Sequence, residues 1–481
     1  MARQDLKGIF DPKSVAVIGV STRGSGLQVG GILFLETLLN YGFEGGLYPV
    51  NPKGGEICGL KIYPNIKDIP ESVDYVICSI PAPKVPQLIQ DCRAKGVKAI
   101  HIYTGGFSES GTEEGKQLEK KISTLARQNG IRLIGPNCMG IYCPEVSLSY
   151  FSDFPKESGS VALICQSGGN SVYMIREAAR RGIRFSKVVS YGNACDVNES
   201  DLLEYLAADE GTKVIMAYIE GVRDGRRFAQ VLSQCAKTKP IIVLKGGITE
   251  EGARAAASHT GALAGGALVW DRLLYQAGAI RVDSLEELVD MAVTFAYLRL
   301  PSGRKAAILG VGGGATVLAA DDCISAGLMV PRFPREIQDK LRSYFPKGDT
   351  GVGLSNPVDL SDQLWGTIYD CAKIMLDYNG IDLLIYHLHV GGWPSFDPNK
   401  LDAGLVSANM EVIKAHHESS KPMAVAIHGA NSPYTQDFAF RLEQKYCQAH
   451  LPVYHSPGNA AKAISRFIKY HERIRPNSLS S

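Results

Sequence analysis

The sequence has no pair of cysteines with C-x-x-C spacing, although 11 cysteines are scattered over its 481 residues. The nearest pair, Cys138 and Cys143, does not have the spacing of a zinc site. Scattered cysteines of this kind are typical of free thiols in a reducing compartment. We therefore expect a cytoplasmic protein without a disulfide framework.

Long apolar segments and a strong net charge are also missing. The first residues carry no apolar signal-peptide core, and the uncharged run 306–320 is too short to span a bilayer and holds four glycines. The formal net charge is only +2, so no overall basic field favours a nucleic acid partner. We expect binding to neither a membrane nor a nucleic acid.

What the chain does contain is a repeated pattern of apolar run, glycine-rich loop and helix. Hydrophobic residues make up 45% and charged residues 21%, values that are ordinary for a globular protein. The pattern predicts an α/β fold with mainly parallel sheets, and the length favours about three domains. We place these domains at 1–145, 146–300 and 301–475, followed by a tail at 476–481.

The first apolar run, 14–20, leads into a turn rich in small residues. A strand, a glycine-rich turn and a helix together form an anion site from main-chain N–H groups. The spacing is not that of a dinucleotide fingerprint, and tight packing is the alternative explanation. The residues of the turn that would approach a ligand are Gly19, Ser21, Thr22, Gly24 and Gly26.

The second strand, 46–50, is followed by Lys53 where an NAD enzyme would place an acidic residue for the ribose. A cation at this point suits a ligand whose ribose carries a phosphate. NADP and coenzyme A both meet that description, and a solvated lysine in a turn is the alternative.

His259 lies in a segment of small residues, 258–265, which reads Ser-His-Thr-Gly-Ala-Leu-Ala-Gly. It follows a buried strand at 241–244 and precedes a helix near 268–275. We hypothesise that its ring nitrogen is a nucleophile that carries a phosphoryl group; a loop histidine with a local hydrogen bond is the alternative. Glu220, directly after the strand 213–218, can orient the imidazole and make its other nitrogen more nucleophilic. An ordinary loop or helix-cap glutamate is the alternative for Glu220.

Two further strands end in glycine-rich turns. We predict that both turns bind phosphate: Ser167, Gly168 and Gly169 form the first, and Gly312, Gly313 and Gly314 form the second. Ser167 does not lie in a hydrolase elbow, because the flanking glycines of G-x-S-x-G are absent.

His387 and His389 fall on one face of a buried strand near 381–388. A metal site would need further ligands, and we predict no metal site in this chain.

Together these motifs resemble the α-subunit of the NDP-forming acyl-CoA synthetases of the ADP-forming acetate–CoA ligase type, relatives of succinyl-CoA synthetase. The resemblance spans nearly the whole chain and is most specific at 245–247 and 258–265. It is supported at 48–53, 105–107, 135–140, 166–168 and 218–221. It implies a Rossmann-like CoA-binding domain followed by two flavodoxin-like domains, the second of them a ligase-CoA domain.

The resemblance also implies roles for single residues. His259 would be phosphorylated during turnover, with Glu220 supporting it. Phosphate would bind at the turns after the strands 160–165 and 305–310. Coenzyme A would be bound by Gly19, Ser21, Thr22, Gly24, Gly26, Val50, Asn51, Lys53, Ile80, Pro81, Gly106 and Asn137.

The implied reaction interconverts acyl-CoA, ADP and phosphate with a carboxylic acid, coenzyme A and ATP, through an acyl phosphate and phosphorylated His259. No ATP-grasp domain is visible, so a separate β-subunit would bind ADP or ATP with Mg²⁺, which predicts a hetero-oligomer. Val311, where the family often has a polar residue, and the two histidines near 388 depart from the family pattern. Two other functions stay open: a non-catalytic CoA-binding regulator and an NADP-dependent oxidoreductase.

Overall fold

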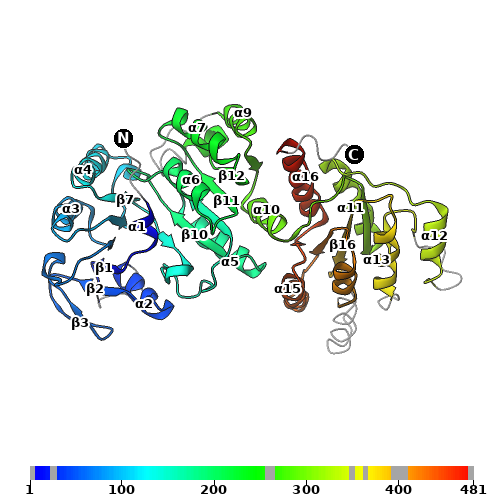
Figure 1. The fold of residues 1–481 in the computed structure, drawn as a ribbon, viewed down its shortest axis with the longest axis horizontal. Helices are drawn as coiled ribbons and strands as arrows, with labels where there is room; N and C mark the ends of the chain where they lie inside the picture. The colour runs from blue at the N-terminus through cyan, green and yellow to red at the C-terminus, as the bar shows by residue number, and fades with distance from the viewer. Residues whose placement is uncertain are drawn as a thin grey trace. The chain divides into compact units, whose positions relative to one another are not determined.

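The computed structural model describes residues 6–21, 30–254, 266–345, 353–360, 367–391 and 410–474. The chain divides into two compact units (Figure 1). Unit 1 consists of Met1–Ala179 and Arg184–Leu288, and unit 2 of Arg180–Ile183 and Val289–Ser481. Among the described residues, unit 1 contains two large sheets and unit 2 contains one.

The first sheet of unit 1 has five parallel strands in the order β2-β1-β5-β6-β7. Every residue of the central strands β1, β5 and β6 is buried, as expected for a parallel sheet that is covered on both faces. The strands are β1 (Ser14–Ile18), β2 (Gly46–Val50), β5 (Tyr75–Cys78), β6 (Ala99–Ile102) and β7 (Arg132–Ile134).

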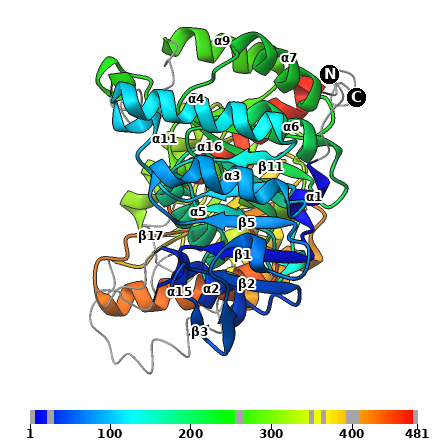
Figure 2. The ribbon, with the colours of Figure 1, turned by 90° about the vertical axis from the view of Figure 1, so that its left-hand side faces the viewer.

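The helices of this first sheet begin and end at recognisable residues. Helix α4 begins where the side chain of Thr112 accepts a hydrogen bond from the N–H of Gly115, and α2 ends at Gly42 in a left-handed conformation. Figure 2 shows α3 and α4 side by side on the flank of the sheet that faces the viewer. The elements are α1 (Lys7–Phe10), α2 (Gly31–Tyr41), α3 (Val85–Arg93), α4 (Glu113–Gln128), a hairpin of β3 (Gly55–Ile57) and β4 (Leu60–Ile62), and short 3₁₀ turns at Ile66–Asp68, Ala82–Lys84, Ser108–Ser110 and Pro144–Val146.

The second sheet of unit 1 has six strands in the order β13-β12-β11-β9-β10-β8. Strand β8 is antiparallel to β10, and the other neighbours are parallel. The strands are β8 (Gly140–Tyr142), β9 (Val161–Cys165), β10 (Phe185–Ser190), β11 (Val214–Ile219), β12 (Ile241–Lys245) and β13 (Ile280–Val282). The domain boundary at 145/146 stays a prediction. Strand β8 lies just before this boundary, at the end of the predicted first domain, but pairs with β10 of the second sheet.

Several helices with described bounds accompany the second sheet. Helix α6 begins with a reciprocal capping box between Asn198 and Asp201. The helices are α5 (Gly168–Arg180), α6 (Glu199–Ala208), α7 (Gly225–Cys235), α9 (Ala267–Ala277) and α10 (Leu285–Tyr297), the last of which continues from unit 1 into unit 2.

Unit 2 is built on a five-stranded parallel sheet in the order β15-β14-β16-β17-β18. Buried side chains of strands and helices form one apolar cluster on this sheet. Its elements are β14 (Ala306–Val311), α11 (Gly313–Ala326), α12 (Arg335–Arg342), β15 (Val358–Asp359), α13 (Ile368–Asp377), β16 (Leu383–His389), β17 (Met423–His428), α15 (Pro433–Gln448), β18 (Val453–Tyr454) and α16 (Pro457–Ile474).

The parallel strands of all three sheets share one order. Numbered by their place in the chain within each sheet, they lie 2-1-3-4-5, which is a common doubly wound arrangement. Ligands of such sheets bind beyond the carboxyl ends of the strands, where the direction of winding reverses. These switch points lie between β1 and β5, between β9 and β11, and between β14 and β16.

The predicted α/β fold with mainly parallel sheets is confirmed. Among the helices that the structure describes, none combines the length and the apolar character needed to cross a membrane.

Candidate active site

The described residues predicted to bind coenzyme A lie along the carboxyl edge of the first sheet, on both sides of its switch point. Gly19 follows β1, and its N–H donates to the carbonyl of Val50 at 2.9 Å. Gly19 has φ +94°, and a Cβ atom there would lie 2.3 Å from the carbonyl oxygen of Ser79. Close packing of β1 against the end of β5 therefore requires a glycine at this position, with or without a ligand.

Asn51 connects the ends of β1 and β2. Its side-chain nitrogen donates to the carbonyl of Val20 at 2.6 Å, and its side-chain oxygen accepts from the N–H of Lys53 at 3.0 Å. The Lys53 side chain is exposed and makes no ion pair with any residue that the structure describes. An exposed, unengaged ammonium group at this edge is available to an anionic ligand.

The remaining first-domain residues extend the same edge. Ile80 and Pro81 follow β5, and the hydroxyl of Thr104 donates to the carbonyl of Ile80 at 2.8 Å. Gly106 has a backbone φ of +99°, and a Cβ atom at this residue would lie 3.6 Å from the Cβ of Ala82. Ser21 and Asn137 also lie in loops at this edge, whereas Thr22, Gly24 and Gly26 lie outside the described residues.

The switch point of the second sheet brings together three buried polar residues. Gln166, Glu220 and Lys245 are 3%, 7% and 5% exposed. They come directly from the carboxyl ends of β9, β11 and β12, three adjacent strands of that sheet.

Hydrogen bonds fix the main chain around Glu220. The side-chain oxygen of Gln166 accepts from the N–H groups of both Glu220 and Gly221, the second at 3.0 Å. The ammonium group of Lys245 donates to the carbonyl of Glu220 at 2.7 Å. Burial lowers the pKa of Lys245, while the charge of Glu220 acts in the opposite direction. Burial also raises the pKa of Tyr218, and the charge of Glu220 adds to this.

The predicted phosphate turn after β9 begins helix α5. The hydroxyl of Ser167 accepts a hydrogen bond from the N–H of Asn170 at 3.3 Å, which caps the first turn. A Cβ at Gly168 would lie 2.8 Å from the side chain of Met139, whereas the space around Gly169 is open within 4 Å. The turn is therefore packed on one side against the first-domain segment 135–140 and open on the other.

His259 itself lies outside the described residues. The preceding segment passes Gly246, where a Cβ would lie 3.3 Å from the Glu220 side chain and 2.7 Å from the hydroxyl of Tyr218. The chain that leads toward His259 thus starts in contact with Glu220. The role of His259 stays a prediction.

The third glycine-rich turn is already engaged by an anionic side chain. The N–H of Gly312 donates to the carboxylate of Asp359 at 3.0 Å, and a Cβ at Gly313 would lie 3.2 Å from the other carboxylate oxygen. A phosphate bound at Gly312, Gly313 and Gly314 would meet this negative charge. That role stays a prediction, and the Asp359 carboxylate opposes it.

The two histidines of β16 belong to a hydrogen-bonded cluster. His387 is fully buried; its Nε2 lies 3.0 Å from the hydroxyl of Thr316 and its Nδ1 lies 3.4 Å from Nε2 of His428. The His389 ring packs on His428 with ring centres 5.1 Å apart. Burial lowers the pKa of His387 to about 3 and that of His428 to about 4, so both rings are neutral at pH 7. No group of His, Cys, Asp and Glu side chains suited to a metal occurs among the described residues.

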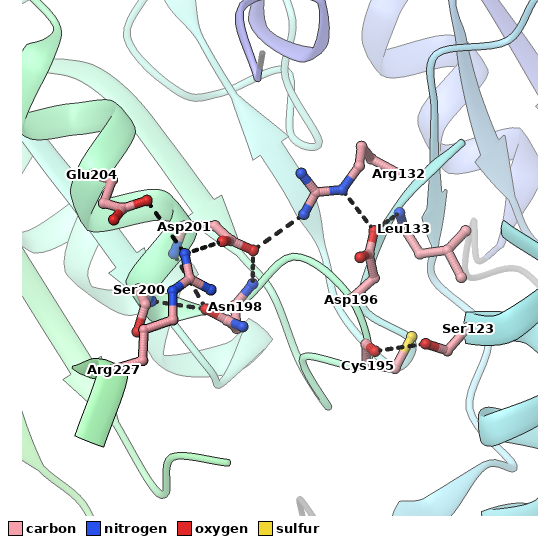
Figure 3. Close-up of polar contacts among 10 residues, drawn as sticks. All are labelled: Ser123, Arg132, Leu133, Cys195, Asp196, Asn198, Ser200, Asp201, Glu204 and Arg227. Carbon is pink, nitrogen blue, oxygen red and sulfur yellow. Dashed lines mark hydrogen bonds and ion pairs between the residues drawn. The ribbon is translucent and has the colours of Figure 1, made fainter. Parts of the chain in front are cut away.

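Polar contacts join the two sheets of unit 1. Arg132, which opens β7, donates to Asp196 at 2.8 Å and to Asp201 at 3.1 Å, and Asp201 also pairs with Arg227 (Figure 3). A second set of contacts involves residues that no sequence motif indicated, namely Glu109, Glu119, Asn193 and Arg223. The available signal was position in the chain: Asn193 comes three residues after the end of β10, and Arg223 comes three residues after Glu220.

Comparison with known proteins places this geometry in a family. The model of a CoA binding domain matches residues 13–144, and that of a succinyl-CoA ligase like flavodoxin domain matches 158–295. The chain is 36% identical to the acetate–CoA ligase [ADP-forming] I subunit alpha of Pyrococcus furiosus over 97% of each chain. It is also 36% identical to the acetate–CoA ligase [ADP-forming] of Methanocaldococcus jannaschii, matching 97% of this chain and 63% of that protein.

A solved structure agrees over the full length. The dinucleotide-forming acetyl-coenzyme A synthetase 1 of Ca. Korarchaeum cryptofilum, in complex with phosphate and ADP, matches with a TM-score of 0.80 and 32% identity over 98% of both chains. The chain therefore belongs to the family of ADP-forming acyl-CoA ligases, which are acid–thiol ligases. It corresponds in extent to the α-subunit, and the family predicted from the motifs is confirmed.

Proposed function

We propose that this chain is the α-subunit of an enzyme that interconverts acyl-CoA, ADP and phosphate with a carboxylic acid, coenzyme A and ATP. The observation that carries the proposal is the similarity to an ADP-forming acetate–CoA ligase α-subunit over 97% of both chains. The buried polar residues at the second switch point support it, because phosphoryl transfer needs preorganised donors and charges around the migrating group.

In the first half of the proposed reaction, phosphate attacks the thioester carbonyl of acyl-CoA, coenzyme A leaves as the thiol, and an acyl phosphate forms. Coenzyme A binds along the first sheet, with Lys53 on the ribose phosphate. This assignment is supported because the residues share the carboxyl edge of that sheet, at the ends of β1, β2 and β5: Gly19, Ser21, Val50, Asn51, Ile80 and Pro81. Gly106 and Asn137 contribute from the loops after β6 and β7, and Thr22, Gly24 and Gly26 complete the proposed set.

In the second half, a ring nitrogen of His259 attacks the phosphorus of the acyl phosphate and the carboxylate leaves. Glu220 accepts a hydrogen bond from the other ring nitrogen and stabilises the positive charge that develops on the ring. Ser167, Gly168 and Gly169 hold the phosphoryl group through the N-terminus of α5. ADP then takes the phosphoryl group from His259, which regenerates the free imidazole.

We assign the nucleotide step to a partner β-subunit with an ATP-grasp domain that binds ADP or ATP together with Mg²⁺. Two observations support this assignment. The Pyrococcus furiosus relative that matches over 97% of each chain is named as a subunit alpha, and the chain matches only 63% of the Methanocaldococcus jannaschii ligase. The working enzyme is then a hetero-oligomer, and we propose that it acts in the cytoplasm.

The test is a reconstituted reaction. The chain and its β-subunit are mixed with acetyl-CoA, ADP, phosphate and Mg²⁺, and free thiol and ATP are measured together. We expect equal amounts of both products, no thiol release when phosphate is left out, and no more than about one thiol per enzyme when ADP or the β-subunit is left out, because the first half-reaction needs neither. Thiol release without ADP and phosphate would identify a thioesterase, and no release in the complete mixture across a panel of acyl-CoA substrates would favour a CoA-binding regulator.

A further inference from the structure

The side chain of Asn193 donates hydrogen bonds to two carboxylates in the part of the chain that builds the first sheet. It follows β10 of the second sheet, and its side chain is 2% exposed. Its amide nitrogen donates to Glu109 at 2.5 Å and to Glu119 at 2.8 Å, both in the segment after β6 of the first sheet. Two acidic groups, 84 and 74 residues away in the sequence, therefore converge on one amide.

Glu109 also binds the main chain of the loop around Gly106, which is predicted to bind coenzyme A. Its other carboxylate oxygen accepts from the N–H of Gly106 at 2.6 Å and from the N–H of Phe107 at 3.2 Å. The conformation of the loop that contains Gly106 thus depends on the position of the Glu109 carboxylate. Asn193 is the side chain of the second sheet that holds this carboxylate.

Glu119 connects the same amide to the Glu220 loop. One of its oxygens accepts from Arg223 at 2.5 Å, and Arg223 also donates to the carbonyl of Asn193 at 2.9 Å. Arg223 lies three residues after Glu220, in the loop whose N–H groups are held by Gln166. A continuous set of hydrogen bonds therefore runs from the Gly106 loop to the loop that carries Glu220.

The main chain around Asn193 is also pressed against the first sheet. Its N–H donates to the carbonyl of Pro136 at 3.0 Å. A Cβ at the preceding residue, Gly192, would lie 2.2 Å from the same carbonyl oxygen. This contact fixes the Asn193 loop beside the segment that contains Asn137, so the amide cannot shift without moving both loops.

We propose that Asn193 and Arg223 are positioning residues that hold the coenzyme A loop at Gly106 and the loop of Glu220 in one arrangement for acyl and phosphoryl transfer. The inference rests on the proposed function. Without the amide of Asn193, two carboxylates would face each other without a shared donor, and their repulsion would move the Gly106 loop. Displacements of about 1 Å at reacting groups can cost about a hundredfold in rate.

The test separates the two half-reactions in the complete enzyme with its β-subunit. For Asn193→Ala we expect the kcat of thioester formation to fall about tenfold or more, with the KM for coenzyme A changed less than about threefold. Labelling of His259 by ATP, which does not use the Gly106 loop, stays within about twofold of the wild type. Arg223→Met, which reaches the Glu220 loop, slows both half-reactions.

A charge exchange tests the physical cause. Asn193→Asp has nearly the same shape but adds a third carboxylate, so we expect a larger loss than for Asn193→Ala. Adding Glu109→Gln to Asn193→Asp restores a donor and acceptor pair between the two positions, and we expect it to recover part of the lost kcat. No recovery in the double variant, with a wild-type rate in Asn193→Ala, would overturn the proposal.

Arg132→Met is the matched control, because it removes another contact between the same two sheets, at the amino end of β7 (Figure 3). We expect it to lower the midpoint of thermal unfolding while the ratio of the two half-reactions stays unchanged. If Asn193→Ala changes both half-reactions and the midpoint in the same way as Arg132→Met, the role of Asn193 is structural only. If wild-type His259 is never labelled, the proposed function fails instead, and the two failures are distinct.

Discussion

Gln166 accepts a hydrogen bond from the N–H of Gly221 through its side-chain oxygen, with the two atoms 3.0 Å apart. The same oxygen accepts from the N–H of Glu220. One buried amide thus holds the turn that presents Glu220 at the switch point of the second sheet. The position of the proposed supporting carboxylate is set by this contact as well as by Lys245.

Replacing Gln166 by methionine removes this acceptor and leaves two buried N–H groups without a partner. We expect a loss of about 1–3 kcal/mol in the free energy of unfolding and a decrease of about tenfold in the rate at which His259 is labelled by ATP. Urea unfolding and rapid-quench labelling measure the two effects. Gln166→Glu keeps an acceptor and serves as the control for stability. An unchanged labelling rate in Gln166→Met would show that the turn does not position Glu220.

Lys53 is expected to recognise the ribose phosphate of coenzyme A. In Lys53→Met, we expect the dissociation constant for coenzyme A to rise about tenfold, which corresponds to about 1.4 kcal/mol. The constant for dephospho-coenzyme A should not change, because this ligand lacks the phosphate. Lys120→Met, on the exposed side of α4, is the matched control. Equal weakening of both ligands, measured by calorimetry, would argue against this role.

Arg181 and Asp290 form a fully buried ion pair in unit 2, with Nη1 and Oδ1 2.7 Å apart and exposed fractions of 0% and 1%. Arg181→Met would leave the aspartate charge buried without this partner, and we expect a loss of about 3–5 kcal/mol in the unfolding free energy. Arg181→Met with Asp290→Leu should lose less. Urea unfolding tests this, with the exposed pair of Arg441 and Asp437 as control. A loss no larger than that of Arg441→Met would contradict the prediction.

The histidine cluster of unit 2 predicts a loss of stability in acid. Burial lowers the pKa of His387 to about 3, and the neighbouring His428 and His389 lower it further through their charges. An unfolded histidine titrates near 6.5, so the unfolded chain takes up the proton first as the pH falls. The stability that the folded state gains from keeping His387 neutral is present in full above about pH 6.5 and is lost between about pH 6.5 and about pH 3. At pH 5 the loss from His387 is about 2 kcal/mol.

Thermal unfolding between pH 4.5 and 8 measures this dependence. His387→Gln removes the titrating group and should flatten the curve over this range, even if it lowers stability at pH 8. His417→Gln, at an exposed histidine, is the control. A curve for His387→Gln as steep as that of the wild type would show that the cluster does not cause the acid sensitivity.

The local pattern of the chain was readable from the sequence. The helix predicted near 268–275 is α9, Ala267–Ala277, and the strand predicted at 160–165 is β9, Val161–Cys165. Apolar runs that end in glycines mark buried parallel strands, because both faces of such strands need apolar side chains. The family and the fold class followed from these runs and from the motifs between them.

Contacts between distant segments were not readable in the same way. Nothing near Gly312 in the sequence indicates that Asp359 accepts its N–H, and nothing near His387 indicates that His428 and Thr316 surround it. Such contacts depend on the order of strands within a sheet, which a single sequence does not specify. The same holds for Asn193, whose partners in the first sheet become visible only when the two sheets are packed together.

The central claim is that His259 carries the phosphoryl group, and its direct test is labelling with γ-³²P-ATP in the presence of the β-subunit and Mg²⁺. We predict one acid-labile, base-stable label per chain, absent in His259→Ala, strongly reduced in Glu220→Gln, and released on addition of the carboxylic acid and coenzyme A. Two results would contradict the account. One is a label that persists in His259→Ala, and the other is a His259→Ala enzyme that forms thioester from ATP as fast as the wild type.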